Sequence, residues 1–273
     1  MKILIATDME GITGVTTWDH VTPGHAEYAR FRKLMTQDVN AAIRGACDAG
    51  AEEVIVADGH WNGSNILIEE LDPRAHLNSG SPAPFSMVQG IDETVDGIFF
   101  LGFHARNGTP NAIIDHTWSS KTVSNVWLND ILTGEYGLNA AVAGHFGVPV
   151  IMATGDQTAC EQIVELLGEL ETTVVKQATG RFSAECLSPA VTQEMIALTA
   201  AHAMERLIDG DVPDPFVMDP PVRVTVEFFT SDMADRACKI PSTIREGTKV
   251  TFSGEEMVSA YLGFRSMVAL AIG

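Results

Sequence analysis

Short apolar runs alternate with amphipathic segments along this chain. Apolar runs that end in polar residues predict buried strands at residues 2–6, 53–57, 97–102 and 148–153. Residues 26–49 place apolar side chains at helical spacing and end at Gly50, which predicts a long helix closed by a glycine. By the same patterns we expect further helices at residues 137–146, 158–167 and 188–207, and further strands at residues 172–176 and 222–228.

The order strand, helix, strand predicts right-handed parallel crossovers. The expected fold class is therefore α/β, with a mainly parallel sheet flanked by helices. After residue 186 the pattern changes to a long helix, a proline cluster at residues 213–221 and a single strand. This change predicts a metal-binding α/β domain over residues 1–186 and a smaller C-terminal α+β lobe over residues 187–273. The proline cluster is an alternative linker.

The charge of the chain limits its partners. With 36 acidic and 17 basic residues the formal charge is −19, which repels nucleic acids and anionic membranes. We therefore expect neither as a partner. The first residues lack the apolar core of a signal peptide, no apolar run is long enough to span a membrane, and the four cysteines form no CxxC pair. These features predict a cytoplasmic protein.

Side chains that can bind metals follow three of the predicted strands. Asp8 and Glu10 follow the first strand, Asp58 and His60 follow the second, and His104 follows the third. In an open α/β sheet, residues beyond the carboxyl ends of the strands meet in one crevice. Carboxylate oxygen and imidazole nitrogen are typical zinc ligands. The spacing therefore predicts a metal site at this edge of the sheet.

Two further candidates, His116 and Glu135, follow later in the chain. The whole set exceeds what one open zinc site uses, whereas two ions that share a carboxylate would use it economically. Asp8 and Glu10 are two residues apart, so both carboxylates point the same way in an extended segment. Their mutual repulsion would be relieved by divalent cations.

Each of these residues, taken alone, also has a structural interpretation. Asp8 and Asp58 could cap turns or helices, His60 and His104 could be hydrogen-bonded core residues, and Glu135 could be a solvated carboxylate at a helix start. Only their joint placement after successive strands favours a metal site. The chain contains no GxGxxG, GxxxxGK[ST], HExxH or GxSxG motif. This argues against dinucleotide enzymes, P-loop NTPases, zincins and nucleophile-elbow hydrolases.

At these residues the sequence resembles the D-aminopeptidase family associated with dipeptide-permease operons, a group of zinc-dependent peptidases. The matching segments occur in order through most of the chain. They are Asp8-Met-Glu10-Gly11-Ile12, Asp58-Gly59-His60, Pro84-Phe-Ser-Met-Val88, Leu101-Gly102-Phe103-His104-Ala105-Arg106, Thr109-Pro110, His116, Asn129-Asp130, Gly134-Glu135-Tyr136-Gly137-Leu138-Asn139-Ala140, Val175-Lys176-Gln177 and Cys186-Leu187-Ser188-Pro189.

The resemblance implies a set of functional residues and an activity. The implied ligands of two zinc ions are Asp8, Glu10, His60, His104 and Glu135. Asp8 is implied to bridge the two ions. His116 is the implied catalytic residue, as nucleophile or general base. The same ligands would accept manganese or cobalt. The implied activity is removal of a D-amino acid from the N-terminus of short peptides, by a homodecamer that encloses its active sites.

Two other functions fit the same residues. Another dinuclear metallohydrolase, a phosphoesterase or an amidohydrolase, would use the same pair of ions. Phosphate sites usually add basic side chains, and Arg106 is the only basic residue adjacent in sequence to the proposed ligands. A non-catalytic metal- or peptide-binding protein would keep the ligands without turnover, and the intact His116 argues against it.

Overall fold

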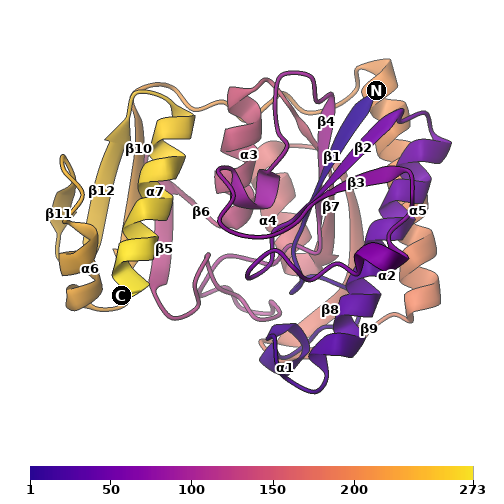
Figure 1. Cartoon of the computed structure of the whole chain (residues 1–273), viewed down its shortest axis with the longest axis horizontal. Coiled ribbons are helices and arrows are strands. Elements are labelled where there is room, and N and C mark those ends of the chain that lie inside the picture. The colour runs from indigo at the N-terminus through magenta and orange to yellow at the C-terminus, as the bar shows by residue number, and fades with distance from the viewer. Residues whose placement is uncertain (273) are drawn as a thin grey trace.

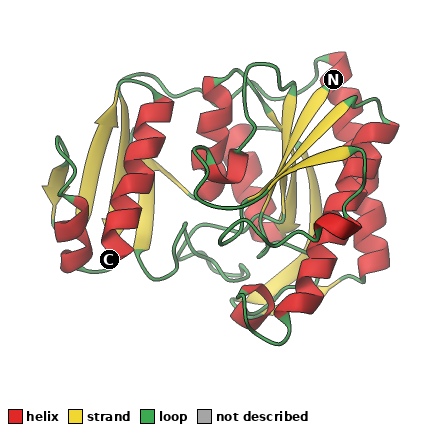
Figure 2. Cartoon of the chain, in the orientation of Figure 1, coloured by secondary structure: helices red, strands yellow, loops and turns green. Residues whose placement is uncertain are grey.

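The computed structural model describes residues 1–272, which form two β-sheets with helices between and around them (Figures 1 and 2). The larger sheet contains β1 (Lys2–Thr7), β2 (Glu53–Asp58), β3 (Ala75–Asn78), β4 (Gly97–Leu101), β7 (Val150–Asp156), β8 (Glu171–Gly180) and β9 (Ser183–Cys186). The smaller sheet contains β5 (Val123–Leu128), β6 (Ile131–Thr133), β10 (Val222–Phe228), β11 (Ile244–Glu246) and β12 (Lys249–Gly254). The helices are α1 (Trp18–Val21), α2 (Tyr28–Asp48), α3 (Glu135–His145), α4 (Gln157–Leu167), α5 (Pro189–Asp209), α6 (Ser231–Ala237) and α7 (Met257–Ile272), with short 3₁₀ turns at Ile68–Glu70 and Ser86–Val88.

The larger sheet is parallel except at one edge. Its strand order is β3-β2-β1-β4-β7-β8-β9, and only the β8–β9 pair is antiparallel. The side chains of the central strands alternate between two cores: Ile3 and Ile5 belong to one, Leu4 and Ala6 to the other. Helices α2 and α5 cover the first face, and α3 and α4 cover the opposite face (Figure 1). Both faces of these strands are therefore buried, as their unbroken apolar sequences predict.

The smaller sheet is antiparallel and has the order β11-β12-β10-β5-β6. Strands β5 and β6 come from the middle of the chain, whereas the other three come from its C-terminal part. Helix α7 packs on this sheet and also contacts α3 on the larger one. One apolar core therefore continues from the larger sheet through α3 to the smaller sheet.

The predicted division at residue 186 does not coincide with the division between the two sheets. Residues 123–133 lie before it but pair with β10, and α5 lies after it but packs along α2 on the larger sheet. The physical reason is the strand pairing of β5 with β10, which joins segments about a hundred residues apart. Such long-range pairings leave no mark on local composition.

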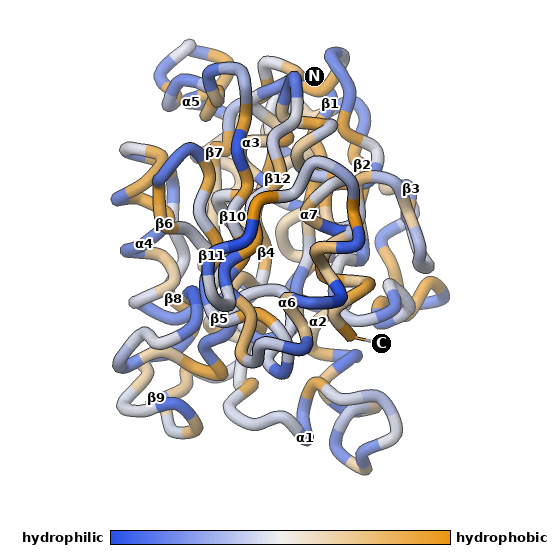
Figure 3. The backbone as a smooth tube through the Cα atoms, turned by 90° about the vertical axis from the view of Figure 1, so that its left-hand side faces the viewer, coloured by the Kyte–Doolittle hydropathy of each residue, from blue (hydrophilic) through white to orange (hydrophobic). Residues whose placement is uncertain are grey.

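The predicted α/β fold class is confirmed, and every helix and strand expected from the sequence is present within a few residues of its expected bounds. Hydrophobic stretches (orange in Figure 3) lie mainly in the packed elements, and hydrophilic stretches (blue) surround β11 and many connecting loops. Among residues 1–272, no helix combines the length and the apolar character needed to cross a membrane.

The packing of α2 on α5 depends on Gly45. A Cβ atom at this position would lie 2.1 Å from the carbonyl oxygen of Ala197 on α5. Helix propensity alone would make Gly45→Ala stabilising by about 1 kcal/mol, but forcing two helices apart costs about 1–3 kcal/mol. We therefore expect Gly45→Ala to lower the free energy of unfolding by up to about 2 kcal/mol in urea denaturation. Lys33→Ala, at an exposed position of α2 that faces Glu70 and not α5, is the control. A stabilised Gly45→Ala protein would contradict the close helix contact.

Candidate metal centre

The proposed ligands gather where the strand order of the larger sheet reverses. From β1 the chain proceeds to β2 and β3 on one side, and β4, β7 and β8 then extend the sheet on the other side. Because the connections diverge there, the carboxyl ends of β1 and β4 border an open crevice. Asp8 and Glu10 follow β1 directly, and His104 follows β4.

Two glycines allow the loops after β1 and β4 to touch. The Gly11 N–H donates a hydrogen bond of 2.7 Å to the Gly102 carbonyl. A Cβ at Gly11 would lie 2.1 Å from the Phe103 carbonyl oxygen, and one at Gly102 would lie 2.3 Å from the Asp8 carbonyl oxygen. Gly102 also has a φ of +75°, which side chains rarely adopt. This close approach brings Asp8 next to His104.

The structure brings together six of the seven side chains that the sequence singled out, all except Asp58, and each of the six is less than 9 % exposed. The two oxygens of Asp8 face different imidazoles, since Oδ1 lies 3.2 Å from Nδ1 of His60 and Oδ2 lies 3.4 Å from Nε2 of His104. The Glu10 Oε2 atom lies 3.1 Å from the same His60 nitrogen. Asp8 therefore has the position that a bridging carboxylate needs.

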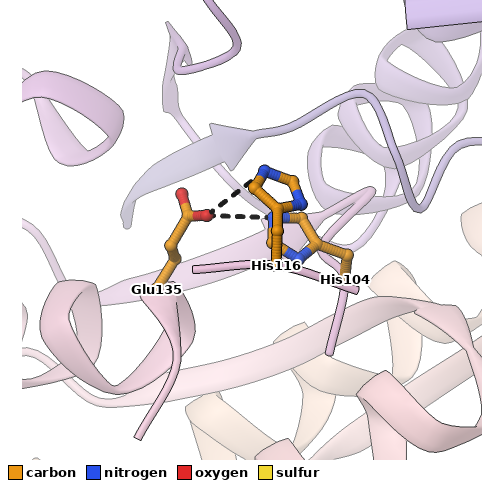
Figure 4. A group of neighbouring side chains, drawn as sticks. All are labelled: His104, His116 and Glu135. Carbon is orange, nitrogen blue, oxygen red and sulfur yellow. Dashed lines mark ion pairs between the residues drawn. The ribbon is translucent and has the colours of Figure 1, made fainter. Parts of the chain in front are cut away.

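Glu135 closes the cluster from the other side. It is the first residue of α3, where a carboxylate is favoured by the helix dipole, and its Oε1 accepts the Trp118 N–H at 2.7 Å. The same oxygen lies 3.0 Å from His104 Nε2 and 3.8 Å from His116 Nε2. The rings of His104 and His116 stack with their centroids 4.0 Å apart (Figure 4). Glu135 is buried here and is not a solvated helix-start residue.

Each histidine uses its other ring nitrogen to hold its orientation. His60 Nε2 donates to the Val21 carbonyl at 2.8 Å, His104 Nδ1 to the Ala105 carbonyl at 2.9 Å, and His116 Nδ1 to the Ile114 carbonyl at 2.8 Å. These bonds direct the remaining nitrogen of each ring toward the carboxylates. Metal-binding histidines are typically oriented in this way.

The donor set fits divalent metal ions. Although Glu10 Oε2 is close to His60, this buried atom makes no hydrogen bond within residues 1–272. Two groups of side chains bring their potential ligand atoms within 4.8 Å of one another; one contains Asp8, Glu10 and His104, and the other contains His104, His116 and Glu135. Nitrogen and carboxylate ligands at such separations suit zinc. The second group also shows that His116 lies close to His104 and Glu135, two of the proposed ligands.

The electrostatics separate the three histidines. Burial, with help from the Glu10 carboxylate, raises the pKa of Asp8 to about 7. Burial by itself would lower the pKa of His104, but Glu135 and Asp8 outweigh it and raise that pKa to about 10. The pKa of His60 is also raised above its ordinary value, because the nearby carboxylates, mainly Glu10, outweigh burial. Burial and the neighbouring His104 instead lower the pKa of His116. His116 is thus the histidine of the cluster that stays neutral and able to accept a proton.

A cavity of about 420 Å³ opens onto the cluster. Besides Asp8, Glu10, His60, His116 and Glu135, its wall includes side chains that the sequence did not mark as functional: Trp18, Trp61, Met87, Trp118, Lys121, Arg265 and Val268. No motif in the sequence points to Trp118, Lys121, Arg265 or Val268, because α7 and the loop after residue 116 reach the cavity only through the packing of the two sheets. Arg106, the basic residue next to His104 in sequence, does not line the cavity.

Asp58 has the structural role that was its alternative interpretation. Its Oδ2 accepts the N–H groups of Asn65 and Ile66 at 2.5 and 2.8 Å, and its Oδ1 accepts the Asn65 side-chain amide at 2.7 Å. These bonds close the loop that carries His60. Asp58 therefore supports the cluster without joining it.

Fold and site together define the class: an α/β protein with a buried carboxylate and histidine cluster at the switch point of a parallel sheet. The family model described as D-aminopeptidase matches residues 1–266. The chain belongs to the D-aminopeptidase family, which confirms the resemblance found in the sequence.

Two individual relatives agree with this assignment. A D-aminopeptidase of Bacillus subtilis (strain 168) is 38% identical over 276 residues, which cover 100% of this chain and 98% of the relative. A solved structure of the zinc-dependent D-aminopeptidase DppA of Bacillus subtilis, described as a self-compartmentalizing protease, is 36% identical and has a TM-score of 0.96. This structural match covers 100% of this chain and 98% of the DppA chain. The likeness therefore extends over the whole fold.

The cluster predicts how the stability of the metal-free protein depends on pH. The pKa of His104 is raised to about 10, so its favourable contribution is complete below its ordinary value of 6.5 and is lost as the pH rises through about 10. The raised pKa of His60 acts in the same direction. Lys176, whose pKa burial lowers to about 8, acts in the opposite direction over this range, but its shift is smaller than the shifts of the two histidines together. We expect the Tm of zinc-free protein to fall between pH 7 and 10, and saturating zinc to reduce this fall, because cations then replace the protons. A zinc-free Tm that rises over this range would contradict the charge balance.

Proposed function

We propose that this protein is a zinc-dependent aminopeptidase that hydrolyses short peptides with a D-amino acid at the N-terminus. The observation that carries the proposal is the burial of three carboxylates and three oriented histidines around one point at the base of a cavity. Membership of the D-aminopeptidase family and the zinc dependence of DppA support it.

We assign two zinc ions per chain to the cluster, held by Asp8, Glu10, His60, His104 and Glu135. Support comes from the two groups of potential ligand atoms and from the opposite directions of the two Asp8 oxygens. Bound zinc would supply Lewis-acid polarisation of the scissile carbonyl and lower the pKa of water. Manganese and cobalt accept the same ligands.

We assign the proton transfer to His116. Its Nδ1–H is held by the Ile114 carbonyl, so Nε2 carries the lone pair and lines the cavity. Its lowered pKa keeps that nitrogen unprotonated at neutral pH, which a general base requires. From there it can take a proton from the attacking group and return it to the departing amine. Trp18 packs edge-on against the ring, with centroids 5.3 Å apart, and restricts its rotation.

The cavity suits a short peptide with charged ends. Carboxylates at its base can accept the free ammonium group of the N-terminus. Lys121 and Arg265 are the basic side chains of its wall and can accept the carboxylate at the other end. Arg265 is oriented for this by hydrogen bonds to the carbonyls of Ala83 and Pro84. A cavity of about 420 Å³ leaves room for only a few residues.

Assembly and location belong to the same proposal. The self-compartmentalizing DppA supports a homo-oligomer, and we propose a homodecamer that encloses its active sites. We also propose a cytoplasmic location, which the four free cysteines support because reducing compartments keep thiols unpaired.

The function is tested by comparing substrates on zinc-loaded protein. We expect hydrolysis of D-Ala-containing dipeptides, slower hydrolysis of the L-alanyl counterparts, and none of an activated phosphate ester. An amidated dipeptide separates recognition of the C-terminal carboxylate from chemistry, since it should raise KM. Peptide binding without turnover, or preference for the phosphate ester, would overturn the proposal.

The catalytic assignment predicts the behaviour of His116→Ala. Loss of the proton acceptor should lower kcat by at least about 100-fold, while zinc content stays near that of the parent. Zinc is measured by mass spectrometry of dialysed protein. His145→Ala, a histidine outside the cavity, is the matched control and should keep full activity. A fully active His116→Ala enzyme would remove His116 from the mechanism.

The bridging assignment predicts a different outcome for Asp8→Ala. Because both Asp8 oxygens face the cluster, its loss should lower zinc occupancy as well as activity, unlike the loss of His116. Asp130→Ala changes an exposed carboxylate of the same type and serves as the control. Zinc occupancy equal to that of the parent would exclude Asp8 as a ligand.

A further inference from the structure

Lys176 is a buried cation beneath the proposed metal centre. It lies on β8 and is only 1 % exposed. Its Nζ donates to the carbonyl oxygens of Glu10, Ile12 and Val15 at 2.6, 2.8 and 2.8 Å. A lysine ammonium has three N–H donors, so these three bonds use all of them and identify the charged form.

All three acceptors belong to one segment, residues 10–15, that begins with a proposed ligand. The segment is almost wholly buried and forms turns rather than a helix or strand. Buried main-chain carbonyls outside regular structure need partners from elsewhere. Lys176 supplies these partners from the neighbouring part of the sheet, 161 or more residues away in the chain.

Burial of an ammonium group costs free energy, which only hydrogen bonds or opposite charges can offset. A methionine would fill the same volume without this cost. Three charge-assisted bonds instead fix the main chain of residues 10–15, and one of them is to Glu10, whose carboxylate lies 3.1 Å from His60. The ammonium therefore acts on the carboxylate through the backbone of the same residue.

Other contacts secure the middle of this segment. The Thr13 N–H donates to Asp38 Oδ2 at 3.0 Å, and the Thr13 hydroxyl donates to Thr192 at 2.8 Å. These contacts come from α2 and α5, on one face of the sheet. Lys176 is distinguished from them because it bonds the carbonyl of Glu10 itself.

We propose that Lys176 is a positioning residue for the metal centre: its ammonium fixes the main chain of residues 10–15 so that the carboxylates of Asp8 and Glu10 keep the spacing that two zinc ions require. This inference rests on the proposed zinc-binding function. It adds a residue that touches neither metal nor substrate.

The test measures zinc affinity by competition with a chelator, together with the visible spectrum of the cobalt-loaded protein. Lys176→Met keeps the length of the side chain but removes all three donors. We expect its zinc affinity to fall by about 10- to 100-fold, as is typical when residues supporting metal ligands are lost. The cobalt spectrum should change because the ligand geometry changes. A fall below about tenfold overturns the proposal.

Three further variants make the result decisive. Thr173→Val, on the same strand, removes a partly buried hydrogen bond to Thr199 on α5 and should lower stability without changing zinc affinity or the cobalt spectrum. Lys176→Arg keeps the charge, but a planar guanidinium cannot direct donors at three converging carbonyls, so we expect it to lose zinc affinity as well. If Lys176→Met fails to fold, the zinc affinity of Lys176→Arg tests the positioning role.

Asp8→Ala distinguishes an error in the proposed zinc site from an error in the proposed role of Lys176. Unchanged zinc binding by Asp8→Ala overturns the zinc site itself. If Asp8→Ala loses zinc but both Lys176 variants bind it normally, only the role of Lys176 is overturned.

Discussion

The structure depends on the burial of three carboxylates in one place. Asp8 lies within a few ångströms of His60 and His104, which in turn lie as close to Glu10 and Glu135, respectively. Burial with repulsion from Glu10 raises the pKa of Asp8 to about 7. Without nearby positive charge such a cluster would destabilise the fold. Protons on His60 and His104 supply that charge when no metal is bound, and divalent ions would supply more of it. The protein is therefore arranged so that metal binding and folding favour the same conformation.

The second requirement is that two sheets meet at the site. The larger sheet delivers Asp8, Glu10, His60 and His104 from the carboxyl ends of its strands, as open α/β sheets commonly do. Glu135 arrives from the other direction, because the β5–β6 hairpin of the smaller sheet leads directly into α3. Helix α7 then completes the cavity wall. Substrate access and the metal centre are thus set by the contact between the sheets.

Some elements of this fold are encoded by neighbouring residues, and others are not. Apolar runs such as residues 2–6 and 97–102 predicted β1 and β4, because strands buried on both faces must be apolar throughout. The polar residues after them predicted a shared crevice, and the structure places these residues within a few ångströms of one another. The smaller sheet was largely missed, since β5, β6 and β12 are short or mixed in polarity and pair with partners far away in the chain. The cavity residues Trp118 and Arg265 were missed for the same reason.

The sequence by itself determined the α/β class, the placement of the central strands and helices, and the identity of the side chains that gather at the switch point, because periodicity and strand-end polarity are properties of neighbouring residues. Only the tertiary structure decided that β5 belongs with β10, that α7 lines the cavity, and that Asp58 supports a loop. It also decided the distinct role we propose for Lys176, a residue that matched the family pattern but had no contact to explain it. The pairing of β5 with β10, the place of α7 and the contacts of Lys176 join segments about 100 to 182 residues apart, and no local pattern encodes such contacts.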